Sequence, residues 1–137
     1  TTLFRSVLRY MLQYSGLGEV IGNAVASASL PLVVVAFVVA ALVRISVGSA
    51  TVAMTMAAGI IAAMPGIAEL SPLYLACTTA AIAGGATVCS HFNDSGFWLV
   101  KSLVGTDEKT TLKTWTIMET LVGGTGFLVA LVISFFA

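Results

Sequence analysis

The sequence predicts an all-α integral membrane protein, and three observations support this prediction. The 137 residues are 58% hydrophobic and only 9% charged, whereas soluble domains carry roughly 25% charged residues. Several apolar runs approach the ~20 residues that a helix needs to cross a bilayer. Short stretches of glycine and polar residues interrupt these runs, which predicts that some of the helices are broken within the membrane.

The first 23 residues differ from the rest of the chain. Apolar residues recur there at helical spacing, while Arg5 and Arg9 fall on the opposite face, so we expect 1–23 to form an amphipathic, interfacial segment. The chain starts at Thr1 without the pattern of a signal peptide. We therefore interpret it as a C-terminal piece of a longer membrane protein, with residues 24–137 as its transmembrane part.

A helical hairpin is expected over about 30–65. Residues 24–43 carry no charge, but Pro31 in a first helical turn would leave a helix too short to span the bilayer. The sequence GSAT at 48–51 then opens a second short apolar helix, which a Pro-Gly pair ends. Two interpretations stay open at this point. The pair is either a re-entrant hairpin with its tip inside the membrane, or two spanning helices with Arg44 at the interface.

A broken helix is expected next, over about 71–100. Ser71 and the proline after it have the pattern of an N-cap and first helical position. The Gly-Gly pair at 84–85 weakens the second half of this helix. The polar run HFNDSG at 91–96 then interrupts it.

The last element is a spanning helix over about 115–137. Residues 101–114 contain three Lys, one Asp and one Glu, so we expect them to form a polar loop, with its lysines favouring the cytoplasmic side. The apolar run that follows begins with Trp115, a residue type that prefers the membrane interface.

The GSAT sequence is the first candidate site. Gly48 permits close backbone approach. The hydroxyls of Ser49 and Thr51, with the free amides from Ala50 onward, can hold an anion or a carboxylate. If the tip lies at mid-bilayer, Arg44 is a costly intramembrane cation that marks a functional site. If the helix spans the membrane, Arg44 extends to the headgroups.

The polar run is the second candidate site. His91, Asn93, Asp94 and Ser95 can donate and accept hydrogen bonds, which suits a polyhydroxylated solute. His91 or Asp94 could also carry a coupling proton. The alternative is a polar loop at the membrane surface. The glycines before the run and the Phe-Trp pair after it favour continued membrane depth, where transporter sites lie.

Glu119 is a third candidate, near the start of the terminal helix. It could face a cavity and carry a proton, or it could lie in the headgroup zone beside the helix N-terminus.

Other classes of function find little support. Six basic and six acidic residues give zero net charge, so no nucleic-acid partner is expected. There is no nucleophile elbow, and a closed zinc site would need four well-spaced ligands. Cys77 and Cys89 are interpreted as buried thiols. We therefore expect no enzyme activity, catalytic residue, metal or cofactor.

Three segments resemble one known family. They are RISVGSATVAMTMAAGII (44–61), SHFNDSGFWLVK (90–101) and TLKTWTIMETL (111–121). They closely resemble the C-terminal portion of the gluconate permease family, which comprises bacterial proton symporters for gluconate and related sugar acids. The segments occur in the family's order, and the resemblance covers nearly the whole chain from about residue 15.

The resemblance implies a fold and a site. The fold would be the C-terminal half of an inverted-repeat transporter, with GSAT as the tip of a re-entrant hairpin and 91–96 as the unwound part of the next helix. Arg44 and the amides of Ser49 to Thr51 would receive the substrate carboxylate. The hydroxyl-binding residues would be Asn93, Asp94 and Ser95, and the candidates for the coupling proton are Asp94, His91 and Glu119.

The resemblance also implies a cellular role. The protein would be a multi-pass protein of the bacterial inner membrane that takes up gluconate or a related acid with protons. Its partners would be this carboxylate substrate, protons, membrane lipid, the N-terminal half of the same protein and, as an option, a second copy. Two alternatives remain open, which are a non-transporting subunit or pseudo-transporter and an intramembrane enzyme. The second would need a facing acid or base that the sequence lacks.

Overall fold

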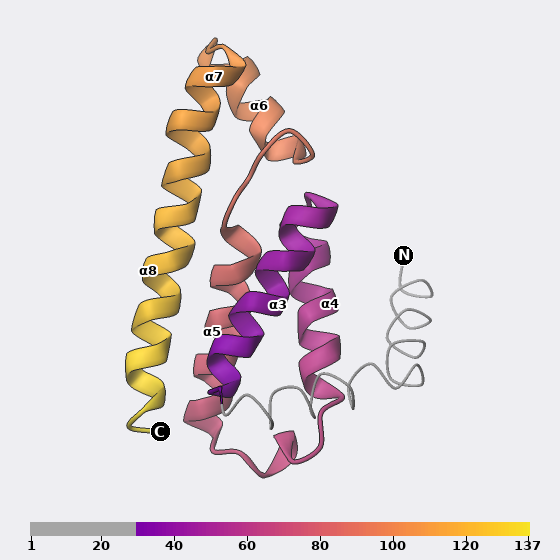
Figure 1. Cartoon of the computed structure of the whole chain (residues 1–137), viewed down its shortest axis with the longest axis vertical. Helices are drawn as coiled ribbons and strands as arrows, with labels where there is room; N and C mark the ends of the chain where they lie inside the picture. Colours follow the sequence, from indigo (N-terminus) through magenta and orange to yellow (C-terminus); the bar gives the residue numbers. More distant parts are fainter. Residues whose placement is uncertain (1–29) are drawn as a thin grey trace.

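The computed structural model describes residues 30–137, and every regular element in this range is helical (Figure 1). The elements in chain order are α3 (Leu32–Val47), α4 (Ala50–Ala62), the 3₁₀ turn η1 (Ile67–Glu69), α5 (Pro72–Thr87), α6 (Ser95–Val104), α7 (Glu108–Thr111), the π-helical η2 (Leu112–Thr116) and α8 (Ile117–Ser134). The predicted all-α class is confirmed for this range. The amphipathic segment expected over 1–23 lies outside the described residues.

Helices α3 and α4 pack against each other as a hairpin with a short tip. Helix α3 starts directly after Pro31, and it ends at Gly48, whose φ of 76° is left-handed. The Gly48 N–H donates to the carbonyl of Arg44 at 2.8 Å. Ser49 then caps α4, since its hydroxyl accepts from the Val52 N–H at 3.4 Å. The two helices have 16 and 13 residues, so each is shorter than the ~20 residues of a full span.

Helix α5 is the centre of the bundle and contacts α3, α4 and α8. It begins as predicted, because the Ser71 hydroxyl accepts from the Tyr74 N–H at 3.1 Å and Pro72 occupies the first turn. Gly84 and Gly85 do not break it, and it runs on to Thr87.

The glycine pair instead lets neighbouring backbones approach. A Cβ on Gly84 would lie 2.7 Å from the carbonyl oxygen of Gly123 in α8, and one on Gly85 would overlap the carbonyl oxygen of Phe37 in α3. Small residues serve close helix packing in membranes in the same way. The helix therefore continues through both glycines, whose lack of a side chain allows this close packing on both sides.

The interruption comes after α5, over residues 88–94. Val88 is extended, and Cys89 has a positive φ of 54°. The chain then crosses beside the hairpin tip and enters α6 at Ser95 (Figure 1). The non-helical stretch thus overlaps the first four residues of the HFNDSG sequence, while its last two, Ser95 and Gly96, already belong to α6, which continues to Val104.

The terminal helix begins earlier than expected. It runs without interruption over Glu108–Ser134, through α7, η2 and α8, rather than starting at about 115. Asp107 is the reason, since its carboxylate accepts from the Thr110 N–H at 3.2 Å and caps the helix. The expected polar loop over 101–114 therefore shrinks to a short turn, and Trp115 lies within the helix.

The distribution of apolar residues is that of a membrane protein. The buried core consists largely of small side chains, among them Ala36, Ala40, Ala53, Ala57, Ala81 and Ala86. Large apolar side chains lie exposed along α8, among them Leu121, Leu128, Val129 and Val132. Within residues 30–137, one helix is long and apolar enough to cross a membrane, namely the 27-residue Glu108–Ser134.

Candidate functional site

The hairpin tip and the broken helix meet at the first two candidate sites. A Cβ on Gly48 would overlap the carbonyl oxygen of Asn93, so only glycine fits at this point of the tip. The Asn93 side chain also donates from Nδ2 to the carbonyl of Ile45 at 2.7 Å. The GSAT and HFNDSG sequences, far apart along the chain, therefore form one polar junction.

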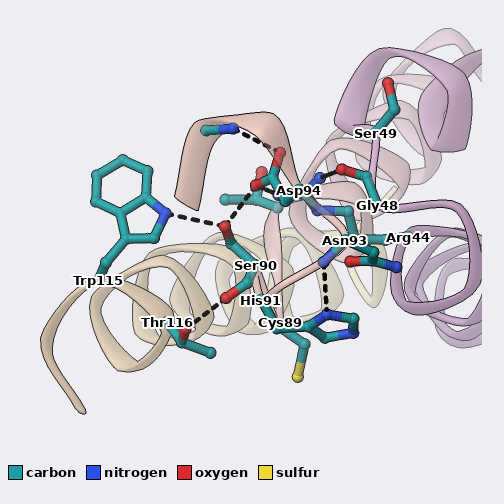
Figure 2. Close-up of polar contacts among 12 residues, drawn as sticks. Arg44, Gly48, Ser49, Cys89, Ser90, His91, Asn93, Asp94, Trp115 and Thr116 are labelled. Atoms are coloured by element: carbon teal, nitrogen blue, oxygen red, sulfur yellow. Dashed lines mark hydrogen bonds and ion pairs between the residues drawn. The ribbon is translucent and has the colours of Figure 1, made fainter. Parts of the chain in front are cut away.

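A buried ion pair lies at the centre of this junction (Figure 2). Arg44 is only 3% exposed and Asp94 only 7%. The Arg44 Nη2 and the Asp94 Oδ2 are 2.5 Å apart, and the Arg44 Nη1 donates to the Gly48 carbonyl at 2.6 Å. Arg44 therefore does not extend to a polar surface in this structure. It is enclosed between the tip and the break.

The carboxylate of Asp94 has further partners on both oxygens. Its Oδ1 accepts from the Gly96 N–H at 3.0 Å and so caps α6. Its Oδ2 accepts from the hydroxyl of Ser90 at 2.5 Å. Ser90 is completely buried. Asp94 thus fixes the start of α6 and the position of Arg44 at once.

The terminal helix, through η2 and the start of α8, supports the unwound segment from the other side. The Trp115 Nε1 donates to the Ser90 hydroxyl at 2.9 Å, and the Thr116 hydroxyl donates to the Ser90 carbonyl. The Thr120 hydroxyl accepts from the Cys89 N–H at 3.1 Å. Figure 2 shows Trp115 and Thr116 on the α8 side of this network. The bonds of Thr116 and Thr120 satisfy the Ser90 carbonyl and the Cys89 N–H, backbone groups that helix formation would otherwise have paired.

Sequence reasoning missed these four supporting residues, namely Ser90, Trp115, Thr116 and Thr120. A signal was available, because 116 and 120 are one helical turn apart and so lie on the same face. The π-helical turn Leu112–Thr116, which contains Trp115 and Thr116, was not detectable by periodicity. Such turns inside α-helices are frequent at functional sites.

The remaining predicted residues surround the junction. Ser49 and Ala50 are half-buried, while Thr51, Asn93 and Ser95 are exposed. The first intrahelical bond of α4 runs from the Ala53 N–H to Ser49, so the N–H groups of Ala50 and Thr51 lie free of that ladder.

The two other proton candidates lie in the break and on α8. His91 is half-buried, and its Nδ1 accepts from the Asn93 N–H at 3.4 Å. Glu119 is also half-buried. It lies on α8 between Thr116 and Thr120, and within electrostatic range of both Arg44 and Asp94.

This arrangement can bind an anion that also carries hydroxyl groups. Arg44 offers a guanidinium, and the start of α4 offers N–H groups and the positive end of a helix dipole. The exposed Asn93 and Ser95 lie on the other side of the junction and offer hydrogen-bonding groups. The chemistry fits a hydroxylated carboxylate better than a metal ion or a purely apolar ligand.

Comparison with known proteins identifies the family of the chain. Residues 6–136 match the family described as GntP family permease. Over 128 residues, the chain is 44% identical to the low-affinity gluconate transporter of Escherichia coli strain K12, covering 92% of this chain and 28% of that protein. It is 39% identical to the gluconate permease of Pseudomonas aeruginosa over 126 residues, with the same 92% and 28% coverage.

A third relative has another sugar acid in its name. The Gnt-II system L-idonate transporter of Escherichia coli strain K12 is 36% identical over 126 residues, again covering 92% of this chain and 28% of that protein. The chain thus spans 28% of the length of these relatives. No solved structure matches it. The match over residues 6–136 includes both halves of the polar junction, and the chain belongs to the GntP family of permeases, which are membrane transport proteins.

Proposed function

We propose that this chain is a C-terminal part of a symporter that moves gluconate or a related sugar acid, together with protons, across the bacterial inner membrane. The observation that carries the proposal is the enclosed Arg44, held where a helical hairpin tip meets a broken helix. A buried cation in an apolar bundle is costly and marks a functional site. The names of the relatives supply the substrate class, gluconate and L-idonate.

The substrate would lie across the junction. Its carboxylate would bind Arg44 and the N–H groups at the start of α4, from Ser49 to Thr51. Its hydroxyls would bind Asn93, Asp94 and Ser95. A hydroxylated chain fits here because both kinds of group occur within one polar region, while the surrounding helices are apolar.

The hairpin would be re-entrant, and the whole protein would cross the membrane several times. Helices α3 and α4 are short, and their tip contacts unwound backbone, which membranes tolerate only inside protein or beside water. Inverted-repeat transporters place their sites at such broken helices. The rest of the same protein, N-terminal to this chain, would complete the site, and a second copy could complete a dimer.

Transport would proceed by alternating access. The hydrogen bond from Asn93 to Ile45 and the close approach of Gly48 to the Asn93 backbone join the hairpin to the broken helix. The two would therefore move as one unit against the rest of the protein. The coupling proton would be carried by Asp94, His91 or Glu119.

The proposal is tested by uptake into proteoliposomes. The full-length protein that contains this chain would be reconstituted, and radiolabelled gluconate uptake measured with and without an inward proton gradient. We expect gradient-driven uptake in the wild type and in the control variant Lys101→Arg, which lies outside the junction. Arg44→Lys should lose it, because an ammonium cannot replace the planar guanidinium.

Two outcomes would contradict the proposal. Gluconate uptake that is equal with and without the proton gradient would contradict proton coupling. A folded protein that takes up no sugar acid would remove the substrate assignment.

A further inference from the structure

The guanidinium of Arg44 has an unused donor beside the one that Asp94 occupies. Of the three guanidinium nitrogens, only Nη2 donates to Asp94. The neighbouring Nε is buried and has no hydrogen-bond partner within the described residues. The Nε and Nη2 N–H groups form one edge of the guanidinium, and a carboxylate can bind that edge with both oxygens. The present ion pair therefore leaves the Nε donor of this edge unpaired.

Asp94 cannot take the second donor while its other contacts persist. Its Oδ1 is bound to the Gly96 N–H, and its Oδ2 also accepts from Ser90. Turning the carboxylate toward Nε would release the cap of α6. A free carboxylate has no such restraint, and a bidentate pair is stronger than a single contact. A sugar acid entering the junction could therefore replace Asp94 on Arg44.

If the sugar acid displaced Asp94 from Arg44, the Asp94 carboxylate would stay buried, while the substrate carboxylate would neutralise the charge of Arg44. A buried carboxylate without a partner is strongly unfavourable, and neutralisation by a proton removes that penalty. The protonated group can keep its Oδ1 contact with Gly96 and can donate its new O–H to the Ser90 oxygen. The local charge then stays balanced, since one substrate anion and one proton have entered together.

We propose that the substrate carboxylate and Asp94 compete for Arg44, and that Asp94 takes the coupling proton when the substrate displaces it. This inference rests on the proposed function and selects one of its three proton candidates. No covalent bond changes. One O–H bond forms on Asp94 with a proton from solvent, and it breaks when the substrate leaves and Asp94 returns to Arg44.

Other charged groups near this carboxylate have to be distinguished from it. They are Arg44 on α3, Glu119 on α8 and His91 in the break. Helices α4 and α5 carry no acidic or basic side chain. Lys101 on α6 is paired with Glu108 at 2.5 Å. The test therefore compares Asp94 with Glu119 and His91.

The experiment is calorimetry of gluconate binding to the purified full-length protein. Titrations at one pH in two buffers of different ionisation enthalpy give the number of protons taken up per gluconate bound. We expect about one proton in the wild type. We expect none in Asp94→Asn, with gluconate still bound. The matched variants Glu119→Gln and His91→Gln should keep the wild-type proton uptake.

A second readout needs no variant. Gluconate added to the wild type should produce the infrared carbonyl band of a newly protonated carboxylic acid. Asparagine caps helices about as well as aspartate, so Asp94→Asn should retain the start of α6.

Different results overturn different claims. Proton uptake that persists in Asp94→Asn, or wild-type binding without proton uptake or the infrared band, overturns the competition. Gradient-driven gluconate uptake by the wild type in vesicles would then still support the proposed function. A wild type that neither binds nor transports gluconate or another sugar acid overturns both.

Discussion

Replacing Arg44 with glutamine should be the most disruptive single change at the junction. The two charged atoms of the Arg44–Asp94 pair are 2.5 Å apart, with side chains that are 4% and 10% exposed. At an effective dielectric constant of ~20 their attraction is about 7 kcal/mol, and desolvation of both ions offsets much of it. Breaking such a pair from one side leaves an unpaired buried charge and costs about 3–5 kcal/mol.

Combining substitutions at Arg44 and Asp94 tests whether the two side chains stabilise the protein as a coupled pair. Arg44→Gln and Asp94→Asn each leave one buried charge, whereas the combination leaves none. We therefore expect the double variant to be about 1–3 kcal/mol more stable than the sum of the single effects predicts. The assay is reversible unfolding of the full-length protein in mixed micelles, followed by circular dichroism. Strictly additive effects would refute the claim that the pair is a coupled unit.

Three further predictions concern the tip, its support and the terminal helix. Gly48→Ala and Gly66→Ala both place alanine at a positive φ, and each should lower the free energy of unfolding by about 1 kcal/mol for that reason. Only the first also meets the break, so it alone should weaken gluconate binding, and equal effects on binding would contradict this. Trp115→Phe removes the indole donor to the buried serine of the break and should lower unfolding free energy by about 1 kcal/mol, whereas unchanged unfolding would count against a supporting role. Hydrogen bonds from Thr110 hold the pKa of Asp107 below its ordinary value of 3.8. The cap therefore stabilises the start of the terminal helix fully above pH 3.8, and this stabilisation is lost as the pH falls through the lowered pKa of Asp107 in the folded protein. The titration of the Thr110 amide by NMR should show a midpoint below 3.8, and a higher midpoint would contradict the cap.

Local sequence signals predicted where several helices begin and end. Ser71 with its following proline marked the start of α5, and Gly48 with Ser49 marked the turn between α3 and α4. These signals work because capping side chains and left-handed glycines act within a few residues. The polar run at 91–96 likewise marked the interruption before α6.

Features that depend on distant residues were not predictable in the same way. Gly84 was expected only to weaken its helix, and its close contact with Gly123 on α8 could not be predicted from the sequence. Arg44 and Asp94 were both candidates, yet their pairing joins residues 50 positions apart. Sequence alone gives the chemical groups of this site, whereas the buried pair between them follows only from the packing of the hairpin on the broken helix.

The central claim is that a sugar acid binds where the hairpin tip meets the break. The most direct measurement is the rate at which a thiol reagent labels Ser49→Cys in the full-length protein, with and without gluconate, read for that peptide by mass spectrometry. Thr114→Cys, an exposed position on the terminal helix, is the control. Gluconate should slow labelling at 49 and leave labelling at 114 unchanged. Equal labelling at 49 with and without gluconate, in protein that still transports it, would contradict the account.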